Sequence, residues 1–233
     1  MILTAHQPVY LPWLGLFHKI ALCDTYVFLD SVKYLKQDWN NRNKIKSAGG
    51  SMWLTVPVAT GGTDHILLPE VRISNEHNWR LKHWRSIQSC YGRAPYFDQY
   101  APFLADMYSR KWEFLSDLNL HLLRWSLEVL GIKPRLLRAS ELDLEGTKSD
   151  LVLDMCRKLG AKTYIFGALG RDYAQVADFE RAGVDLIFQD YRHPQYPQLH
   201  GGFVSHLSII DLLFNCGPRS FEVLMQNQET ISR

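Results

Sequence analysis

The sequence MILTAHQPVYLPWLGLFHKIALCDTYVFLD, residues 1–30, decides the fold class. Short apolar runs at residues 1–5 and 25–30 are typical of buried β-strands. Between them, at residues 11–23, apolar residues recur at the spacing of one helical face, at Leu14, Phe17, Ile20 and Ala21. The order strand, helix, strand predicts a β-α-β opening whose two strands are parallel neighbours in one sheet.

The rest of the chain alternates in type after a helical middle section. Helices are expected at residues 78–91, 95–109 and 114–131. From residue 134 onward we expect strands at 135–140, 162–167 and 184–189, alternating with helices at 149–160, 172–183 and 207–215. Repeated β-α units favour an α/β fold with a mainly parallel, Rossmann-like sheet flanked by helices.

Three further expectations concern the limits of these elements. Ser149 is expected to cap the helix at 149–160, and the helix at 207–215 is expected to be the last. Strands at 52–58 and 68–74 are expected to be joined by a glycine-containing turn at 59–65. We expect a single domain over residues 1–233, with a candidate helical sub-lobe at about 77–131.

The composition excludes several classes of protein. The net charge of +2 and the 21% of charged residues give no overall basic character of the kind that binds nucleic acid or an anionic membrane. The N-terminus lacks a signal-peptide pattern, and no apolar run approaches the roughly 20 residues that cross a bilayer. We therefore expect a cytoplasmic protein with no nucleic-acid partner and no membrane insertion.

No cofactor or metal is indicated. The cysteines, at positions 23, 90, 156 and 216, are too widely spaced for a CxxC site, and we expect reduced thiols. His193 and His200 lie seven residues apart, but no glutamate or cysteine completes a known ligand spacing, so no metal site is predicted. The GxGxxG fingerprint and the Walker motif are missing, which leaves any cofactor unknown.

A basic segment, DSVKYLKQDWNNRNKIK at residues 30–46, follows the second predicted strand. From residue 33 to 46 it carries five cations and one acid. We expect residues 31–51 to form a long loop without helix or strand, and loops of this length are usually functional or disordered. Its aromatic residues argue against disorder, so we expect an ordered loop in which Trp39 is buried or half-buried.

Two loops are expected to meet at the carboxyl ends of the first two strands, where parallel sheets bind ligands. The segment HQPVYLPW, residues 6–13, is predicted to be the floor of a pocket for an anionic small molecule, and the basic segment its charged wall. The predicted substrate-binding residues are Gln7, Tyr10, Lys36, Trp39, Arg42, Asn43 and, in the glycine-containing turn GALGRDY, Arg171. Turn capping by Gln7 and Tyr10, and a surface role for Arg171, are the alternatives.

His83 and Asp30 are the predicted catalytic residues, because either side chain can move a proton beside such a pocket. His83 shares a helical face with Trp79. That face is distinct from a predicted packing stripe of Leu81, Trp84 and Ile87. A surface or packing role for His83 is an equally open alternative.

Several segments together resemble the WbqC-like family of bacterial proteins. They are HQPVYLPWLGLFHKI, DSVKYLKQDWNNRNKIK, WLTVPV, KHWRSI, YGRAPYF and GFVSHLSIIDLLFNCG, which extend over almost the whole chain. The family pattern is strongest at Gln7, Pro8, Pro12, Asp30, Lys36, Trp39, Arg42, Asn43, Lys82, His83, Tyr91 and Asp211. The resemblance implies a soluble bacterial protein encoded among genes for surface polysaccharides, such as O-antigen, or for specialised metabolites.

Three functions stay open. The first is a transferase that acts on an anionic activated small molecule, such as a nucleotide-sugar or an acyl donor, in one of these pathways. The second is a non-catalytic binding or assembly partner of a polysaccharide-pathway enzyme, anchored by Trp39, Trp53, Trp79 and Tyr34. The third is a nucleotidyltransferase-like enzyme, which matches the β-α-β outline although the H-x-G-H signature is missing.

Overall fold

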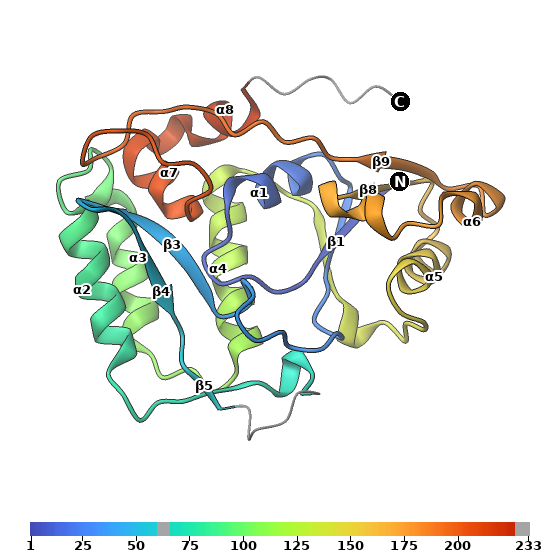
Figure 1. Ribbon diagram of the computed structural model, residues 1–233, viewed down its shortest axis with the longest axis horizontal. Coiled ribbons are helices and arrows are strands. Elements are labelled where there is room, and N and C mark those ends of the chain that lie inside the picture. Colours follow the sequence, from blue (N-terminus) through green and yellow to red (C-terminus); the bar gives the residue numbers. More distant parts are fainter. Residues whose placement is uncertain (60–65, 227–233) are drawn as a thin grey trace.

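Five parallel strands form the central sheet of the computed structural model, which describes residues 1–59 and 66–226 (Figure 1). In spatial order the strands are β7 (Arg135–Arg138), β2 (Thr25–Phe28), β1 (Ile2–His6), β8 (Thr163–Phe166) and β9 (Asp185–Phe188). Every neighbouring pair is parallel. The sheet confirms the predicted α/β fold.

The predicted β-α-β opening is present. β1 and β2 pair in parallel from Leu3↔Thr25 to His6↔Phe28, and helix α1 (Leu14–Ala21) joins them. All four residues of β2 are buried, because helices and loops cover the sheet on both faces.

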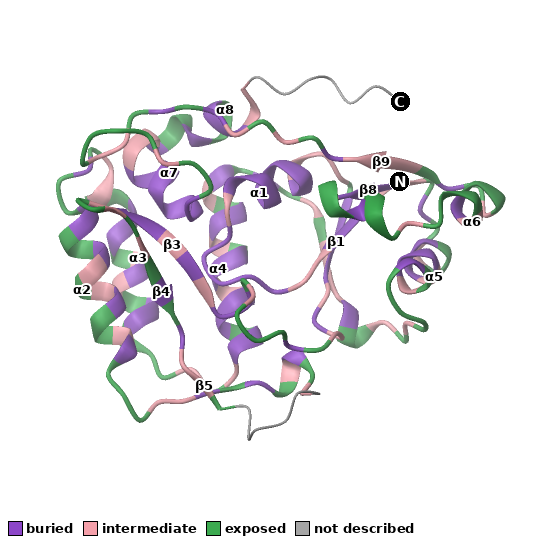
Figure 2. Cartoon of the chain, in the orientation of Figure 1, coloured by how far each residue is buried: buried purple, intermediate pink, exposed green. Residues whose placement is uncertain are grey.

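Helices pack on both faces of the sheet. Leu3 and Ala5 of β1 belong to one apolar cluster with residues of α5 (Ser149–Leu159) and α6 (Val176–Arg181). Tyr26 and Phe28 of β2 belong to a second, larger cluster that includes the apolar side of α1. The alternation of side chains along each strand therefore fills two separate cores, and Figure 2 shows the inward sides of α1 and α5 as buried.

The helical middle section consists of α2 (Trp79–Tyr91), α3 (Phe97–Ser109) and α4 (Leu115–Leu130). Together with α7 (Ile209–Cys216) and α8 (Ser220–Met225), these helices contribute to the larger cluster that also contains α1. In Figure 1, α2 and α3 lie at the opposite end of the molecule from α5 and α6. The apolar core thus continues from one face of the sheet into the helical section.

The basic segment is not a structureless loop, contrary to the prediction. Residues Arg42–Ser47 form strand β3, which pairs in antiparallel fashion with β4 (Gly50–Thr55). The hairpin buries Ile45 and Leu54, and its turn has Gly50 at φ +110°, where a side chain would be strained. The alternation of apolar residues in this short hairpin was hidden by the lysines and the arginine between them.

Other element limits also differ from the expectations. The strand expected at 52–58 is divided between β4 and the short strand β5 (Val58–Ala59). The strand expected at 68–74 is replaced by the 3-10 turn Leu68–Glu70 and the short strand β6 (Arg72–Ile73). Of the turn expected at 59–65, residues 60–65 lie outside the described residues. The remaining 3-10 turns are Ala139–Glu141, Ala168–Asp172 and Gly217–Arg219.

Two helix predictions are corrected. Ser149 is the first residue of α5 rather than its cap, and its hydroxyl accepts a hydrogen bond from the backbone N–H of Gln175 at 3.0 Å. The helix expected at 207–215 is not the last, because α8 follows it. None of the helices in the described parts of the chain has the length and apolar character needed to span a bilayer.

Candidate functional site

The order of the strands reverses between β1 and β8. The chain leaves β1 for β2 and β7 on one side and leaves β8 for β9 on the other. In open parallel sheets, ligands bind outside the carboxyl ends of the strands at such a switch point. The strand order therefore directs attention to the ends of β1 and β8, whereas the sequence indicated the ends of β1 and β2.

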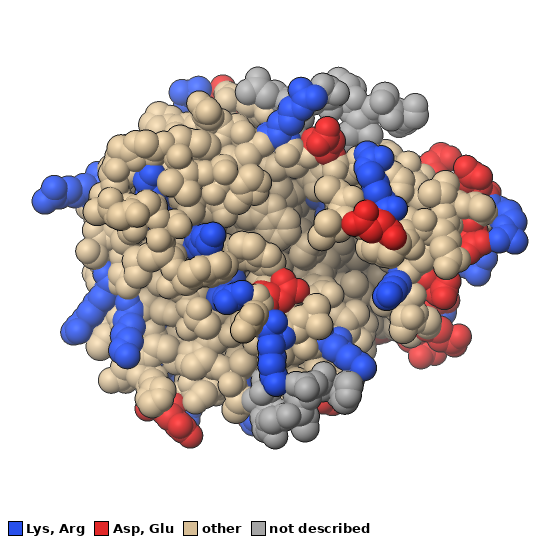
Figure 3. All heavy atoms as spheres, in the orientation of Figure 1, with Lys and Arg blue, Asp and Glu red and all other residues tan. Residues whose placement is uncertain are grey.

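β1 and β8 part before their carboxyl ends. Their last pair is Leu3↔Tyr164, whereas β1 and β2 stay paired to His6↔Phe28. Figure 3 shows the surface hollowed in the middle of this face, where Figure 1 places β1. Separation of the two strands at the switch point opens the sheet at the position where a ligand is expected.

We call this region, which lies at the ends of β1 and β8 and is bordered by His6 and Gly167, the switch-point crevice. Just below it, the hydroxyl of Thr4 donates a hydrogen bond to the carbonyl of Ile165 at 2.7 Å. A side chain thus replaces the backbone pairing that the two strands lose.

The N-terminus of α1 faces the carboxyl end of β1, because only the loop at residues 7–13 separates them. Trp13 precedes the helix, and no side chain caps its first N–H groups. A Cβ added to Gly15 would lie 2.6 Å from Nε1 of Trp13 and 3.1 Å from the Tyr191 ring, so only glycine fits this close approach. Uncapped N–H groups and the helix dipole favour an anion at such a place.

His6 is half-buried at the end of β1. Its Nδ1 lies 2.8 Å from the carbonyl of Gln7, so Nδ1 donates and Nε2 carries the lone pair. Its ring makes an edge contact with Trp13, at 5.3 Å between ring centroids. Burial and the nearby Lys19 ammonium lower the pKa of His6 to about 3, so the imidazole is neutral at pH 7.

Arg171 lies in the exposed turn after β8, on the other side of the crevice from the basic segment. Its guanidinium stands over the ring of Phe188, 4.8 Å from the centroid. A Cβ on Gly170 would lie 2.5 Å from Cβ of Phe166, so this turn packs directly on the end of β8. The guanidinium thus packs on the end of β9, and a role for Arg171 in binding stays a prediction.

The structure brings the predicted floor and wall together. The side-chain amide of Asn40 donates to the carbonyl of Pro8 at 2.8 Å, and that of Asn43 donates to the carbonyl of Leu11 at 2.6 Å. The backbone N–H of Tyr10 donates to the carbonyl of Trp39 at 3.1 Å. These bonds fix the basic segment to residues 7–12. They also occupy the donors of Asn43, so its proposed contact with a ligand stays a prediction.

Arg42 lies in a cluster of aromatic and basic side chains on the outer face of the β3–β4 hairpin. Its guanidinium carbon is 4.6 Å from the centroid of Trp53, and Nζ of Lys44 is 4.9 Å from it. The ring of Trp39 lies 5.3 Å from that of Trp53. Arg42 also donates to the carbonyl of Gln37. We call Trp39 and Trp53 the tryptophan pair.

The tryptophan pair is more exposed than the sequence suggested. Trp39 keeps 38% of its surface exposed and Trp53 43%, so the expected burial of Trp39 is not found. Lys36 is exposed on the same segment, and Gln7 is half-buried at the end of the floor. The indole of Trp39 persists at the surface because it packs against Trp53 rather than the core.

His83 faces the core and not an open pocket. It is 7% exposed, its Nδ1 lies 2.9 Å from the hydroxyl of Tyr10, and burial lowers its pKa to about 4. The same hydroxyl contacts that of Tyr108. Leu81, placed on the packing stripe by its spacing, is 44% exposed, so that part of the prediction is wrong. The buried side of α2 instead contains Trp79, His83 and Ile87.

Asp30 connects the ends of β2 and β7. Its carboxylate accepts from the guanidinium of Arg138 at 2.8 and 2.9 Å, and from the N–H and hydroxyl of Ser140 at 2.8 and 2.9 Å. The side chain is fully buried. These contacts hold the carboxylate in place between the two strand ends, and a catalytic role for Asp30 stays a prediction.

Asp211 is a buried carboxylate to which the sequence reasoning assigned no role. Tyr91 donates to it at 2.9 Å, and Tyr196 and Gln198 at 2.8 Å each. Buried Lys46 lies near it and donates to the carbonyl of Gly201 at 2.9 Å. A single acid within the apolar run LSIIDLLFN was the available signal, because a buried carboxylate requires hydrogen-bond donors.

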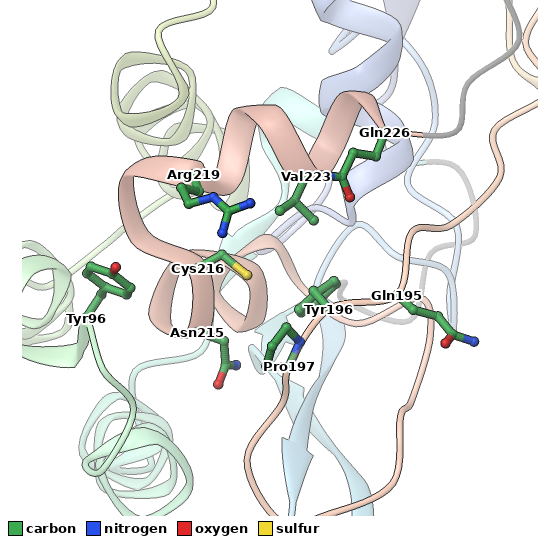
Figure 4. A pocket seen from close by; sticks show the side chains of 9 residues that line it. All are labelled: Tyr96, Gln195, Tyr196, Pro197, Asn215, Cys216, Arg219, Val223 and Gln226. Carbon is green, nitrogen blue, oxygen red and sulfur yellow. The ribbon is translucent and has the colours of Figure 1, made fainter.

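A cavity of about 240 Å³ lies away from the switch-point crevice, between residues 195–197 and the helices α7 and α8 (Figure 4). Cys216 points toward it. Burial raises the pKa of this thiol to about 11, which disfavours a nucleophilic thiolate. Within residues 1–59 and 66–226, no group of three or more His, Cys, Asp or Glu side chains is arranged to hold a metal.

Comparison with known proteins identifies the family. A model of the WbqC-like protein family matches residues 7–223. The chain is 35% identical over 220 residues to "Uncharacterized protein Rv1507c" of Mycobacterium tuberculosis, which covers 94% of this chain and 95% of that protein. No solved structure matches the chain. The chain therefore belongs to the WbqC-like protein family.

Proposed function

We propose that the protein is a transferase that acts on an anionic activated small molecule, a nucleotide-sugar or an acyl donor, bound in the switch-point crevice. The observation that carries this proposal is the separation of β1 and β8 beyond Leu3↔Tyr164, directly in front of the uncapped N-terminus of α1. Parallel α/β folds bind phosphorylated ligands in this position.

Charge near the crevice supports an anionic donor. Arg171 stands at the end of β8, and the basic segment with Lys36 and Arg42 follows β2. An arginine fork can hold a phosphate or carboxylate by two parallel hydrogen bonds. Gln7 borders the same opening and can orient a polar group of the substrate.

Three residues are candidates for a role at the acceptor or in proton transfer. His83 and Asp30 were proposed from the sequence, and both are buried and hydrogen-bonded in the fold. His6 lies closer to the strand ends, and its Nε2 lone pair can accept a hydrogen bond from the hydroxyl of an acceptor substrate. We include His6 as a candidate for orienting the acceptor, because its low pKa makes it a weak base.

The pathway belongs to the same proposal. Surface-polysaccharide or specialised-metabolite biosynthesis is implied by the family resemblance, and activated sugars and acyl groups are the donors that such chemistry requires. The test is a thermal-shift screen with nucleotide-sugars, nucleotides and acyl thioesters. A ligand at 100 times its dissociation constant stabilises a protein by about 2.7 kcal/mol.

A matched pair of arginine variants locates the ligand. Arg171→Ala should weaken binding of the selected donor about 10-fold or more. Arg181→Ala should leave it unchanged, because Arg181 pairs with Asp178 on the outside of α6. Mass spectrometry of donor and acceptor mixtures then tests group transfer. Absence of any shift with all three donor classes would reject the proposal.

The tryptophan pair favours a second candidate, a non-catalytic partner of a pathway enzyme. Trp39, Trp53 and Leu35 expose large apolar surfaces on one hairpin and its adjoining loop. Exposed tryptophans beside arginine are typical of protein interfaces. If Trp53→Ser leaves donor binding unchanged but abolishes complex formation with a purified pathway enzyme, the pair serves association rather than transfer.

A further inference from the structure

Helix α1 carries a lysine on its buried side. Lys19 is only 4% exposed, and its ammonium donates a hydrogen bond to the carbonyl of Ala5 in β1 at 3.0 Å. An ammonium has three N–H donors and a full charge, which one neutral carbonyl does not balance. Lys19 therefore needs a counter-charge.

The described chain does not provide one. No ion pair within residues 1–59 and 66–226 includes Lys19. The titratable groups near it are His6 from β1 and Cys23 after α1, with Tyr26 of β2 next to Cys23 and the hydroxyl of Tyr164 in β8 at the backbone of Ala5. Burial lowers the pKa of His6 and raises those of Cys23, Tyr26 and Tyr164, so all four are neutral at pH 7. Burial likewise lowers the pKa of Lys19 to about 8. A buried charge without a partner destabilises a fold.

The ammonium lies between the two parted strands. The carbonyl of His6 accepts from the N–H of Leu29, so it points toward β2. Successive carbonyls of a strand point to opposite sides, and the carbonyl of Ala5 therefore points toward β8. β8 does not pair with β1 beyond Leu3, so the carbonyl of Ala5 accepts a hydrogen bond from Lys19 instead of from β8. The buried cation thus lies beneath the switch-point crevice.

Two side chains in or beside α1, His18 and Tyr191, keep a donor that is not used by Gln189. Nε2 of Gln189, just beyond β9, donates to the carbonyl of Gly15 at 2.9 Å and lies 2.8 Å from Nδ1 of His18. His18 is then a neutral ring with Nε2–H as its donor. The hydroxyl of Tyr191 is buried without a hydrogen-bond partner, and its ring lies 5.0 Å from that of His18.

We infer that Lys19 supplies the positive charge of a buried oxyanion site between β1 and β8, which receives the phosphate or carboxylate group of the substrate. The inference rests on the proposed function for the identity of the substrate and on the geometry of α1 and β1 for the site. A bound oxyanion balances the charge that the free protein leaves unmatched. Proteins retain such destabilising groups at functional sites.

The test compares Lys19→Met with Lys162→Met, which removes an exposed lysine before the amino end of β8. Melting temperatures are measured without ligand and with pyrophosphate, inorganic phosphate or acetate, at constant ionic strength set by chloride. The phosphates and acetate distinguish a phosphate site from a carboxylate site. Lys19→Met should raise the melting temperature of the ligand-free protein and weaken oxyanion binding 10- to 100-fold. Lys162→Met should change neither.

The outcomes separate this inference from the proposed function. A Lys19→Met protein that is less stable than the wild type and binds oxyanions equally well would show a structural lysine, and the inference fails. A wild type that binds none of the three probes also overturns it. Oxyanion binding that depends on Lys19, without transfer from any donor, supports the site and rejects the transferase. If Lys19→Met still transfers a group from a donor with an unchanged KM, the transferase is supported and the oxyanion site is rejected.

The pH dependence gives an independent readout. A bound oxyanion stabilises the protonated ammonium, and acetate does not change its own charge above pH 7. Wild-type affinity for acetate should therefore be constant from pH 7 to about 8 and fall above it by up to about 10-fold per pH unit. His6, Cys23 and Tyr26 do not change charge between pH 7 and 10 in the folded protein. Affinity in Lys19→Met should lack this decline, and an identical decline in both proteins contradicts the inference.

Discussion

The hydroxyl of Tyr10 lies 2.9 Å from Nδ1 of His83, although 73 residues separate them in the sequence. The same hydroxyl contacts that of Tyr108 in α3. All three side chains are buried, and burial raises the pKa of both tyrosines. This polar cluster joins the loop after β1 to two helices of the middle section, so it positions the floor of the predicted pocket relative to the helical core.

Tyr10→Phe should destabilise the fold by about 1–3 kcal/mol, because Tyr108 and His83 lose a buried hydrogen-bond partner while the apolar volume is kept. Denaturant unfolding measures the change. Tyr173→Phe is the matched control, since Tyr173 is 42% exposed. Equal stabilities for Tyr10→Phe and the wild type would show that the cluster contributes little.

Acid should destabilise the protein between pH 6.5 and 4 through its buried histidines. The pKa of His83 in the folded protein is about 4, and that of an unfolded histidine is about 6.5. The unfolded chain therefore binds the proton first as pH falls, and the free energy of unfolding decreases by on the order of 3 kcal/mol for this group. Urea unfolding of the wild type and His83→Gln at both pH values should show a smaller decrease in the variant.

Arg42→Ala should weaken ligand binding 10- to 100-fold and leave the melting temperature close to that of the wild type. Arg42→Lys should not restore binding, because lysine keeps the charge but lacks the planar fork that stands over Trp53. Calorimetry with the donor found by the screen gives the affinities. Arg72→Ala, which removes an exposed arginine over Phe114, is the control. Parallel losses of stability and affinity would instead assign Arg42 to holding the segment in place.

Asp211→Asn should cost at least about 2 kcal/mol of stability, because the charged acceptor of three hydrogen bonds is removed. Two of the donors, Tyr196 and Gln198, lie in the segment before α7. Limited proteolysis should therefore detect faster cleavage within residues 191–206. Asp185→Asn replaces an exposed carboxylate and should behave like the wild type. Unchanged cleavage in Asp211→Asn would contradict the assigned role of the network.

Local patterns predicted most of the helices and all strands of the central sheet. The spacing of apolar residues on α1 and α4 was sufficient, because helix periodicity depends on residues only three or four positions apart. The same reasoning failed for β3, where lysines and arginine alternate with Asn43 and Ile45, although it predicted a strand that overlaps β4. It also misplaced the buried side of α2, since the partners that select Trp79 and His83 over Leu81 come from distant segments.

The sequence predicted only part of the site correctly, because local patterns do not show which distant segments meet. Contact between residues 7–12 and the basic segment followed from their shared position after adjacent parallel strands, and it is present. The location of Arg171 across the crevice, and the inward orientation of His83, depend on strand order and helix packing. Asp211 and Lys19 lie in apolar stretches, where only their burial reveals their importance.

The sequence alone determined that this chain forms β-α-β units with a parallel sheet, because each strand and helix carries its own apolar period. Only the tertiary structure decided the strand order, the separation of β1 and β8 at the switch point, and the absence of a counter-charge for Lys19 among the described residues. These properties belong to pairs of segments more than a hundred residues apart, or to the space between them. Local periodicity contains no information about which distant segments meet.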